Sequence, residues 1–266
     1  MYLPVEQYLL TPAQLAQLDY AIGLLTQDCM KRFQFSLDIP AELTHQRTGS
    51  QIPRRYGPSD LSEAQQYGYH SRPDEDRDLA KVPPPEDLPA AEQFVLTGNT
   101  NTAANSAPTL SGGLDIPPGG CRGAAVREIG GGAGSYAGSE LAQQIGDTSF
   151  MRAKSDDRVT AVNSAWSACM KTHGYAYQTP MDAFSDSQWK GSQMASQLEL
   201  SVATADVTCK QQTNLIGVWY SVESAFQQQQ IQKHAEQLAQ DQSRMQQELG
   251  RTADVLRTAN KPGTTG

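Results

Sequence analysis

The sequence predicts a mainly α-helical protein with two disulfide-clasped helical halves, a long irregular insertion and a long C-terminal helix. The main observation is a repeated phrase: the Cys-Met-Lys that opens Cys29–Phe35 returns in Cys169–Tyr175, with an aromatic residue six positions after each cysteine. Apolar residues recur every three or four positions before both copies, which is typical of amphipathic helices. Each copy is followed by one further cysteine, Cys121 or Cys209.

The four cysteines allow three pairings. The repeat favours Cys29–Cys121 and Cys169–Cys209, and in the chain-entropy model each closure stabilises the fold by roughly 4–5 kcal/mol. The alternative is four unrelated buried thiols. No two cysteines have the spacing of a zinc ribbon or a redox pair. Disulfides, if formed, indicate an oxidising and therefore extracytoplasmic compartment.

The first predicted helix begins after Thr11. The threonine is a good N-cap, Pro12 suits the first turn, and Gln14 can complete a capping box. The apolar pattern continues to Arg32 and places Cys29 on the buried stripe. A partner element must therefore pack against this helix.

An irregular insertion follows, from Ser36 to about Gly120, because prolines recur along it and prevent long regular elements. Within it, Leu61–Gln66 is a short helix candidate, and residues 98–113 have the composition of a flexible exposed loop. A helix is expected from Arg122, and a glycine-rich run ends the first half.

The second half is more regular. Helices are expected over residues 139–152 and 159–170, the second stopped by Gly174 as a C-cap glycine. A short helix follows at Thr179, and a longer one runs from Gln193 through Cys209 to Phe226. The expected organisation is a helical half over 1–129 with its proline-rich insertion, a linker over 130–138, a helical half over 139–226 and an extension over 227–266.

The glutamine-rich extension is expected to form a helix from Phe226 to about Asn260, followed by a disordered tail. Ile231, Leu238 and Met245 fall at the heptad spacing of a coiled coil. The other seam positions, Asp241, Glu248 and Thr252, are polar, which argues against stable self-pairing. Two interpretations stay open: a helix docked on its own domain, or a projecting helix that contacts a protein partner.

Composition excludes some classes of function. The 266-residue chain has a formal net charge of −8, which argues against nucleic-acid binding, since that needs a basic face. No apolar run is long enough to span a membrane. Residues 1–10 lack the features of a signal peptide, so a cytosolic location is the alternative to an extracytoplasmic one.

Few residues suggest catalysis. The chain has four histidines, none of them in a metal-ligand pair, and no nucleophile elbow, phosphate loop or calcium loop is present. We therefore expect no metal site and no cofactor, and we assign no catalytic residue. His70 is the most site-like histidine, because it lies in an aromatic and partly polar cluster.

Candidate binding residues come from two arginine- and tyrosine-rich islands and from the tryptophans of the second half. They are Arg54, Arg55, Tyr56, Tyr67, Tyr69, His70, Trp189 and Trp219. Exposed aromatics and arginines could form a groove for a glycan or a peptide. The alternative is that the aromatic residues pack in a core and that the arginines form a polar cap.

The chain resembles a group of actinobacterial proteins of uncharacterised function that are predicted to be secreted or lipid-anchored. The resemblance rests on Tyr8-Leu9, Cys29-Met30, Tyr67–His70, Pro118–Gly123, Trp166–Met170 and Ala205–Cys209. It covers most of the chain apart from the glycine-rich linkers and the tail. It implies a location at the cell envelope, near transporters or cell-wall assembly, and no established activity.

The leading hypothesis is a non-catalytic extracytoplasmic module that binds a ligand or protein at the cell envelope, with the C-terminal helix as the partner contact. One alternative is an enzyme acting on envelope glycans or peptides, in which His70 works with Glu63 or Asp74. The other is a cytosolic scaffold whose thiols are reduced.

Overall fold

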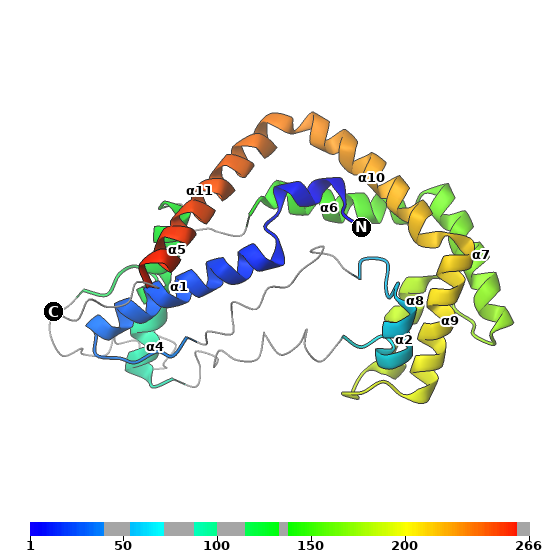
Figure 1. Cartoon of the computed structure of the whole chain (residues 1–266), viewed down its shortest axis with the longest axis horizontal. Coiled ribbons are helices and arrows are strands. Elements are labelled where there is room, and N and C mark those ends of the chain that lie inside the picture. Colours follow the sequence, from blue (N-terminus) through cyan, green and yellow to red (C-terminus); the bar gives the residue numbers. More distant parts are fainter. Residues whose placement is uncertain (40–53, 72–87, 100–114, 133–137, 260–266) are drawn as a thin grey trace. The chain divides into compact units, whose positions relative to one another are not determined.

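A computed structural model of the chain describes residues 1–39, 54–71, 88–99, 115–132 and 138–259 (Figure 1). These residues are mainly helical, as predicted, and the described ranges contain no strand beyond an isolated bridge between Arg55 and Gly57. The predicted tail from Lys261 and most of the predicted loop over 98–113 lie outside the described residues. None of the helices in the described part combines the length and hydrophobicity that a membrane span requires.

The chain divides into two compact units, each assembled from segments far apart in the sequence. Unit 1 contains η1 (Pro4–Tyr8), α2 (Leu61–Tyr67), α6 (Glu140–Lys154), α7 (Asp157–Thr172), α8 (Pro180–Phe184), η4 (Ser187–Trp189), α9 (Gln197–Thr213) and α10 (Leu215–Lys233). Unit 2 contains α1 (Pro12–Arg32), α4 (Ala90–Thr97), α5 (Gly120–Gly130) and α11 (Ala235–Ala259) from Ala239 onward. The division predicted from the repeated phrase, into helical halves over 1–129 and 139–226 joined by a linker, stays a prediction.

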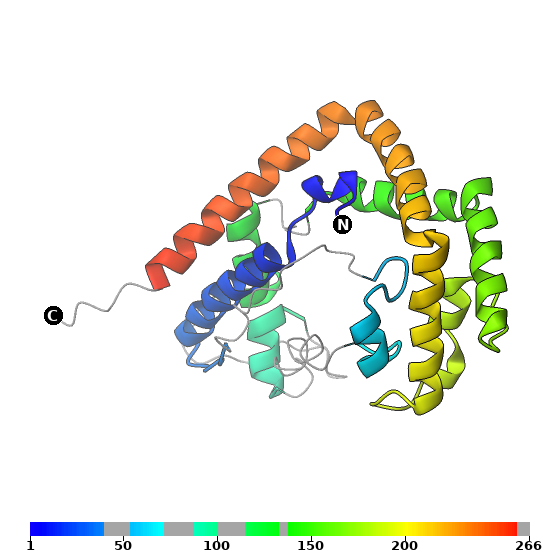
Figure 2. The same ribbon diagram turned by 45° about the vertical axis from the view of Figure 1, so that its right-hand side comes forward.

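Both expected disulfides are present. The first clasp, Cys29–Cys121, joins α1 to α5 in unit 2, and the second clasp, Cys169–Cys209, joins α7 to α9 in unit 1. The two Cα–Cα distances are 5.5 Å and 5.7 Å, in the usual range for a disulfide. Figures 1 and 2 show α7 running beside α9.

The repeated phrase ends both helices in the same way. In the first copy the Phe35 N–H donates to the Met30 carbonyl, and in the second the Tyr175 N–H donates to the Met170 carbonyl. The residue before each aromatic, Gln34 or Gly174, has a left-handed backbone conformation. This is the hydrogen-bond pattern that closes a helix C-terminus around a left-handed residue.

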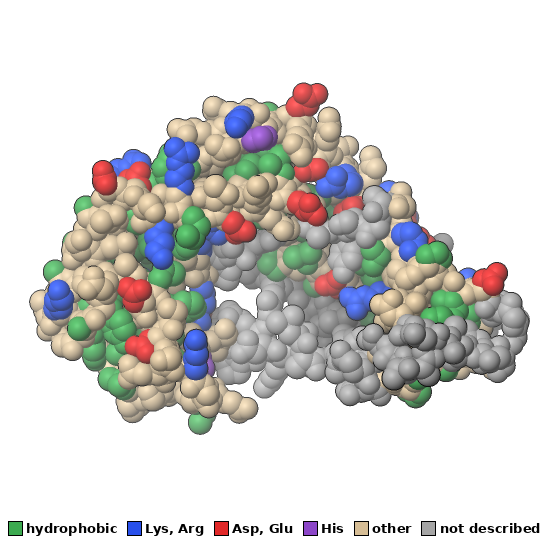
Figure 3. Space-filling model, turned by 180° about the vertical axis from the view of Figure 1, so that it is seen from behind, with side chains coloured by type: hydrophobic (Ala, Val, Ile, Leu, Met, Phe, Trp, Pro, Cys, Tyr) green, Lys and Arg blue, Asp and Glu red, His purple; other side chains and the backbone are tan. Residues whose placement is uncertain are grey.

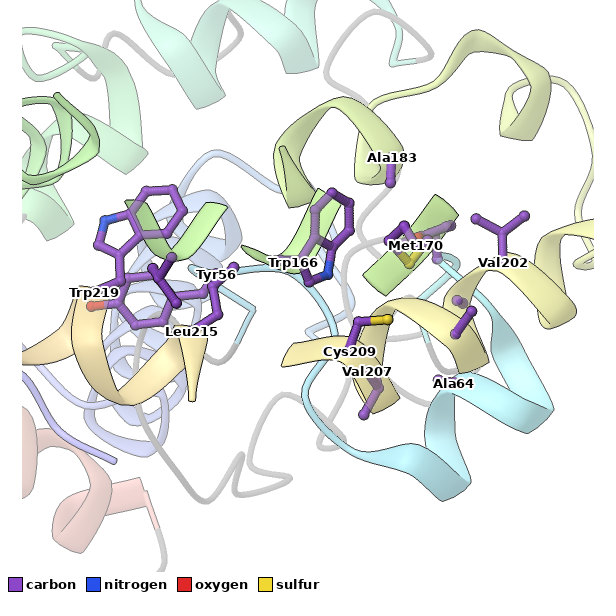
Figure 4. Close-up of a cluster of buried hydrophobic side chains, with 14 of the residues drawn as sticks. Tyr56, Ala64, Trp166, Met170, Ala183, Val202, Val207, Cys209, Leu215 and Trp219 are labelled. Carbon is purple, nitrogen blue, oxygen red and sulfur yellow. The ribbon is translucent and has the colours of Figure 1, made fainter. Parts of the chain in front are cut away.

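Unit 1 has the larger core. Trp166, Met170 and Cys209 lie in it beside Trp219 and Tyr56, whose rings are 5.4 Å apart (Figure 4). A second cluster packs Val5 of η1 against α6 and Leu238. All three tryptophans, Trp166, Trp189 and Trp219, are buried, in agreement with the interpretation that they pack in a core.

Unit 2 is held by α1, α5 and α11. Leu18 and Ile22 of α1 pack with Ile129 of α5 and Met245 of α11. The polar seam residues of α11 are buried as well. Asp241 accepts a hydrogen bond from the Ser139 hydroxyl, and Glu248 is only 1% exposed. The carboxylate of Glu248 has no hydrogen-bond partner among the described residues, and its burial raises the pKa of that group.

The prediction of continuous helices from Gln193 to Phe226 and from Phe226 to about Asn260 is wrong in one respect. The chain breaks at Asn214, which adopts a left-handed conformation (φ 52°), and again at His234 (φ −114°). Asparagine tolerates the left-handed region better than most residues, so the first break has a local cause. The periodic apolar pattern continues across both breaks, and so it could not reveal them.

The described surface carries no large patch of one charge on the face shown in Figure 3, where Lys and Arg side chains lie interspersed with Asp and Glu side chains. This mixture agrees with the modest acidic charge of the chain. A face of this kind gives no continuous basic track for a nucleic-acid backbone.

Candidate functional site

Two short tyrosine-containing segments, the islands Arg54–Gly57 and Tyr67–His70, contact buried carboxylates on the long helices of unit 1. Arg55 Nε donates to Glu223 Oε1 at 2.7 Å, and the Tyr56 hydroxyl donates to Glu223 Oε2 at 2.9 Å. Gln227 and Ser149 complete the shell around this fully buried glutamate. Burial is the largest cause of a raised pKa at Tyr56, so the phenol stays protonated and can donate.

A second carboxylate, Asp206 of α9, forms a buried ion pair with Lys210 at 2.9 Å. Asp206 also accepts from Trp166 Nε1 at 3.0 Å, and Lys210 donates to the Pro58 carbonyl at 3.0 Å. Burial raises the pKa of Asp206, and the Lys210 ammonium opposes that rise. Because both side chains have 0% exposure, each charge depends on the other.

The third carboxylate, Glu199, holds the Tyr-Gly-Tyr-His island. It accepts from the Tyr69 N–H at 2.8 Å and lies 2.7 Å from His70 Nδ1, while His70 Nε2 lies 2.8 Å from the Ser192 carbonyl. Gly68 is needed here, because a Cβ would come within 2.6 Å of Glu199 Oε1. The hydrogen bond to Glu199 raises the pKa of His70.

This arrangement decides what His70 can do in the free protein. Both ring nitrogens face acceptors, so the imidazole satisfies both hydrogen bonds only when it carries two protons. A general base needs an unprotonated nitrogen that faces its substrate. His70 therefore acts here as a cation that holds the island to α9 and to the Ser192 backbone.

The remaining candidate binding residues have mostly internal positions. Arg54 donates to the His70 carbonyl at 2.9 Å and lies over the Phe184 ring, Tyr67 is half-buried, and Trp219 stacks on Phe150. Trp189 stacks on Tyr69 and donates to the Ala183 carbonyl. Of the predicted set, Trp189 lines a cleft; the role of the others in binding stays a prediction.

That cleft has a volume of about 350 Å³ and opens on the surface of unit 1. It is lined by Gly174, Tyr175, Ala176, Tyr177, Asp186, Gln188, Trp189, Leu198 and Val202. Its apolar edge is exposed, since Leu198 keeps 52% of its surface accessible. The cleft therefore combines aromatic rings, polar planar groups and an exposed aliphatic lip.

The polar wall of the cleft is preorganised. The Tyr177 hydroxyl donates to Asp186 Oδ2 at 2.8 Å, and Gln188 donates to the same carboxylate through its backbone and side chain. The backbone hydrogen bond from Gln188 is the main cause of the lowered pKa of Asp186. The carboxylate is thus ionised at neutral pH and fixed in orientation.

Unit 2 has a cleft of similar volume, about 350 Å³, over the start of α5. Its lining consists of Thr97, Gly119, Arg122, Gly123, Val126 and Arg127. The two arginines give it a cationic character, in contrast to the aromatic cleft of unit 1. It has none of the aromatic side chains that the first cleft presents.

A further cluster of possible ligands, at the second clasp, was not predicted from the sequence. Ligand atoms of Cys169, His173 and Cys209 lie within 4.8 Å of one another. Cys169 and His173 are four residues apart at the end of α7, and this spacing, which places residues of a helix on one face, could have revealed the cluster.

The carboxylates Glu199, Asp206 and Glu223 were also missed. Each lies on a helix and contacts an island more than a hundred residues away in the sequence.

Comparison with protein-family models, curated proteins and solved structures found no match. The resemblance to the actinobacterial group therefore stays a prediction.

Proposed function

We propose that this protein is a non-catalytic ligand-binding protein of an extracytoplasmic compartment, and that the aromatic cleft of unit 1 is its ligand site. The observation that carries this proposal is the lining of the cleft, where Tyr175, Tyr177 and Trp189 lie beside Asp186 and Gln188. Ligand sites in proteins are concave and combine apolar walls with a few well-placed polar groups.

The chemistry of the lining favours an oligosaccharide over a peptide. A sugar ring has an apolar C–H face that can pack on an aromatic ring, and a rim of hydroxyl groups. The fixed carboxylate of Asp186 and the amide of Gln188 can accept from and donate to such hydroxyls. Leu198 would cover a second apolar face at the lip.

The compartment is supported by the two disulfides, which form and persist in oxidising surroundings. A position at the cell envelope, near a transporter or cell-wall assembly, rests on the resemblance alone. The alternative of a cytosolic scaffold with reduced thiols requires both clasps to be open.

The enzymatic alternative has less support. It needs His70 to exchange protons with a substrate, whereas Glu199 and Ser192 occupy both ring nitrogens. One of the two carboxylates suggested as its partner, Asp74, lies outside the described residues.

A protein partner on the C-terminal helix would have to use the outer face of α11. Its apolar side chains Met245, Leu249 and Leu256 pack within unit 2, and Leu238 packs within unit 1. The docked interpretation of this helix therefore has the better support.

The proposal can be tested with disulfide-intact protein and a panel of soluble oligosaccharides (chito-, cello- and malto-hexaose), with neutral hexapeptides as the comparison. Binding is measured by calorimetry and by tryptophan fluorescence, since Trp189 lines the cleft. We expect saturable binding of at least one oligosaccharide, and a loss of about tenfold or more in affinity for Leu198→Asp.

Met151→Asp is the matched control. Met151 is 61% exposed on α6 of the same unit and does not line the cleft. Equal losses in the two variants, or saturable binding of peptides alone, would contradict the oligosaccharide site. No binding to either panel would overturn the proposal.

A further inference from the structure

The second clasp lies beside a histidine in a geometry that the first clasp lacks. Cys169 and His173 are four residues apart at the end of α7, and Cys209 faces them from α9. The three ligand atoms lie within 4.8 Å of one another. Two sulfurs and an imidazole nitrogen are a donor set that zinc prefers.

We propose that the second clasp becomes a zinc site when it is reduced, with Cys169, Cys209 and His173 as ligands. The site is distinct from the proposed oligosaccharide site and does not rest on it. The disulfide and the metal ion exclude each other, because zinc binds thiolates and not a disulfide.

The change from disulfide to zinc site takes two steps. A dithiol reductant gives two electrons and two protons to the Cys169–Cys209 bond, so that two protein thiols form and the reductant becomes a disulfide. Zinc then binds both sulfurs while their two protons pass to water, and the neutral His173 ring donates a nitrogen lone pair. The protein thereby exchanges a covalent bond for a metal ion.

The distances allow this exchange with small movements. Zinc–sulfur bonds of about 2.3 Å in a tetrahedral site place two sulfurs about 3.8 Å apart. The ligand atoms already lie inside 4.8 Å, so rotation of the two cysteine side chains after reduction is sufficient. A water molecule can take the fourth position, and Gln212 Oε1 lies 3.4 Å from Cys169 Sγ.

The scaffold does not depend on the disulfide alone. Trp166 of α7 donates to Asp206 of α9 at 3.0 Å, one turn before each cysteine. Both side chains are fully buried in the core of unit 1. We therefore expect α7 and α9 to stay side by side after reduction, which keeps the three ligands together.

The first clasp is an internal control. It ends its helix with the same backbone hydrogen bonds, yet it has Phe33 at the position that corresponds to His173. Reduction there gives two thiols without the nitrogen ligand. The reduced first clasp is therefore expected to bind zinc more weakly than the second, and substitutions at His173 and Phe33 separate the effect of the third ligand from that of the surroundings.

The test uses the full chain, reduced with a phosphine under anaerobic conditions, and Zn²⁺ with a competing chromophoric chelator. We expect the reduced protein to bind zinc tightly and the oxidised protein to bind none. His173→Phe, which copies the first clasp, should lower the affinity of the reduced protein by at least roughly tenfold. Circular dichroism of each reduced sample checks that the helices persist.

His234→Phe controls for the loss of a histidine elsewhere in unit 1. Phe33→His supplies the reverse change, and we expect it to add a second zinc equivalent to the reduced chain. Equal affinities in the reduced wild type and in His173→Phe would overturn the proposal. Absence of zinc binding in a reduced protein that keeps its helical spectrum would also overturn it.

Discussion

The two clasps share a helix-ending backbone but lie in different surroundings. Cys29–Cys121 lies in a small cluster whose buried members are apolar, with Met30, Val95 and Leu96. Cys169–Cys209 lies in the larger core of unit 1, beside the buried pair of Asp206 and Lys210. The repeat therefore determines the local backbone conformation, whereas the neighbouring helices determine which apolar contacts and ion pairs surround each disulfide.

The largest expected effect is the loss of a clasp. The loops that the disulfides close span 92 and 40 residues, and because the entropy depends on the logarithm of loop length, each clasp should contribute roughly 4–5 kcal/mol. We expect Cys29→Ala/Cys121→Ala and Cys169→Ala/Cys209→Ala to lower the free energy of unfolding by similar amounts. Urea unfolding followed by circular dichroism measures both.

Tryptophan fluorescence separates the units in the same experiment, since all three tryptophans lie in unit 1. Losses that differ between the two variants by more than about 2 kcal/mol would show that packing, and not loop entropy, decides the contribution of a clasp.

The next effect comes from the buried pair that distinguishes unit 1. Lys210→Met leaves the Asp206 carboxylate buried without its cation, which should cost about 3–5 kcal/mol. Arg257→Met in α11 is the matched control, because its partner Asp254 and Arg257 itself are 67% and 69% exposed. That control should stay within about 0.5 kcal/mol.

Restoring neutrality sharpens this result. Asp206→Asn/Lys210→Met keeps an acceptor for Trp166 and removes the unpaired charge, so we expect it to recover part of the loss. A Lys210→Met variant as stable as the Arg257→Met control would refute the role given to the buried pair.

The helix ends could be predicted because their causes are local. Thr11, Pro12 and Gln14 form the capping box of α1 as expected, and both copies of the repeated phrase end their helices. The pairing of the cysteines followed from the same repeat. The capping box and the two helix ends depend on residues within one or two turns, whereas the disulfides join residues 92 and 40 positions apart and could be paired only because the phrase is repeated.

The polar network could not be predicted, since its contacts are long-range. Glu199 and Asp206 lie on α9, which is buried on several sides and therefore lacks a clear amphipathic pattern. On such a helix a carboxylate looks like a solvent-facing residue. The arginines and tyrosines that bind these acids looked like an exposed surface for the same reason.

A pH titration tests how the Tyr-Gly-Tyr-His island is held. The hydrogen bond to Glu199 raises the pKa of His70 above its ordinary value of about 6.5. The folded state thus binds this proton more tightly than the unfolded state. The resulting stability is complete below about pH 6.5 and is lost as the pH rises through the raised pKa.

We expect His70→Gln to lower the free energy of unfolding by about 1–2 kcal/mol at pH 6, a range reduced for the partial exposure of the ring. The difference from wild type should shrink toward pH 9, as measured by urea unfolding at each pH. His234→Gln controls for the removal of a histidine. A difference that grows with pH would mean that His70 is held as the neutral ring.

The smallest effect addresses the repeat itself. Gln34 and Gly174 occupy the same left-handed position, with φ of 65° and 86°. A side chain disfavours this conformation, and nothing lies within 4 Å of a Cβ built on Gly174, so its replacement changes the backbone preference alone. Gln34→Gly should stabilise unit 2 by about 1 kcal/mol, and Gly174→Gln should destabilise unit 1 by a similar amount. Urea unfolding of the two reciprocal variants decides the matter, because shifts of the same sign would mean that the two helix ends are not equivalent.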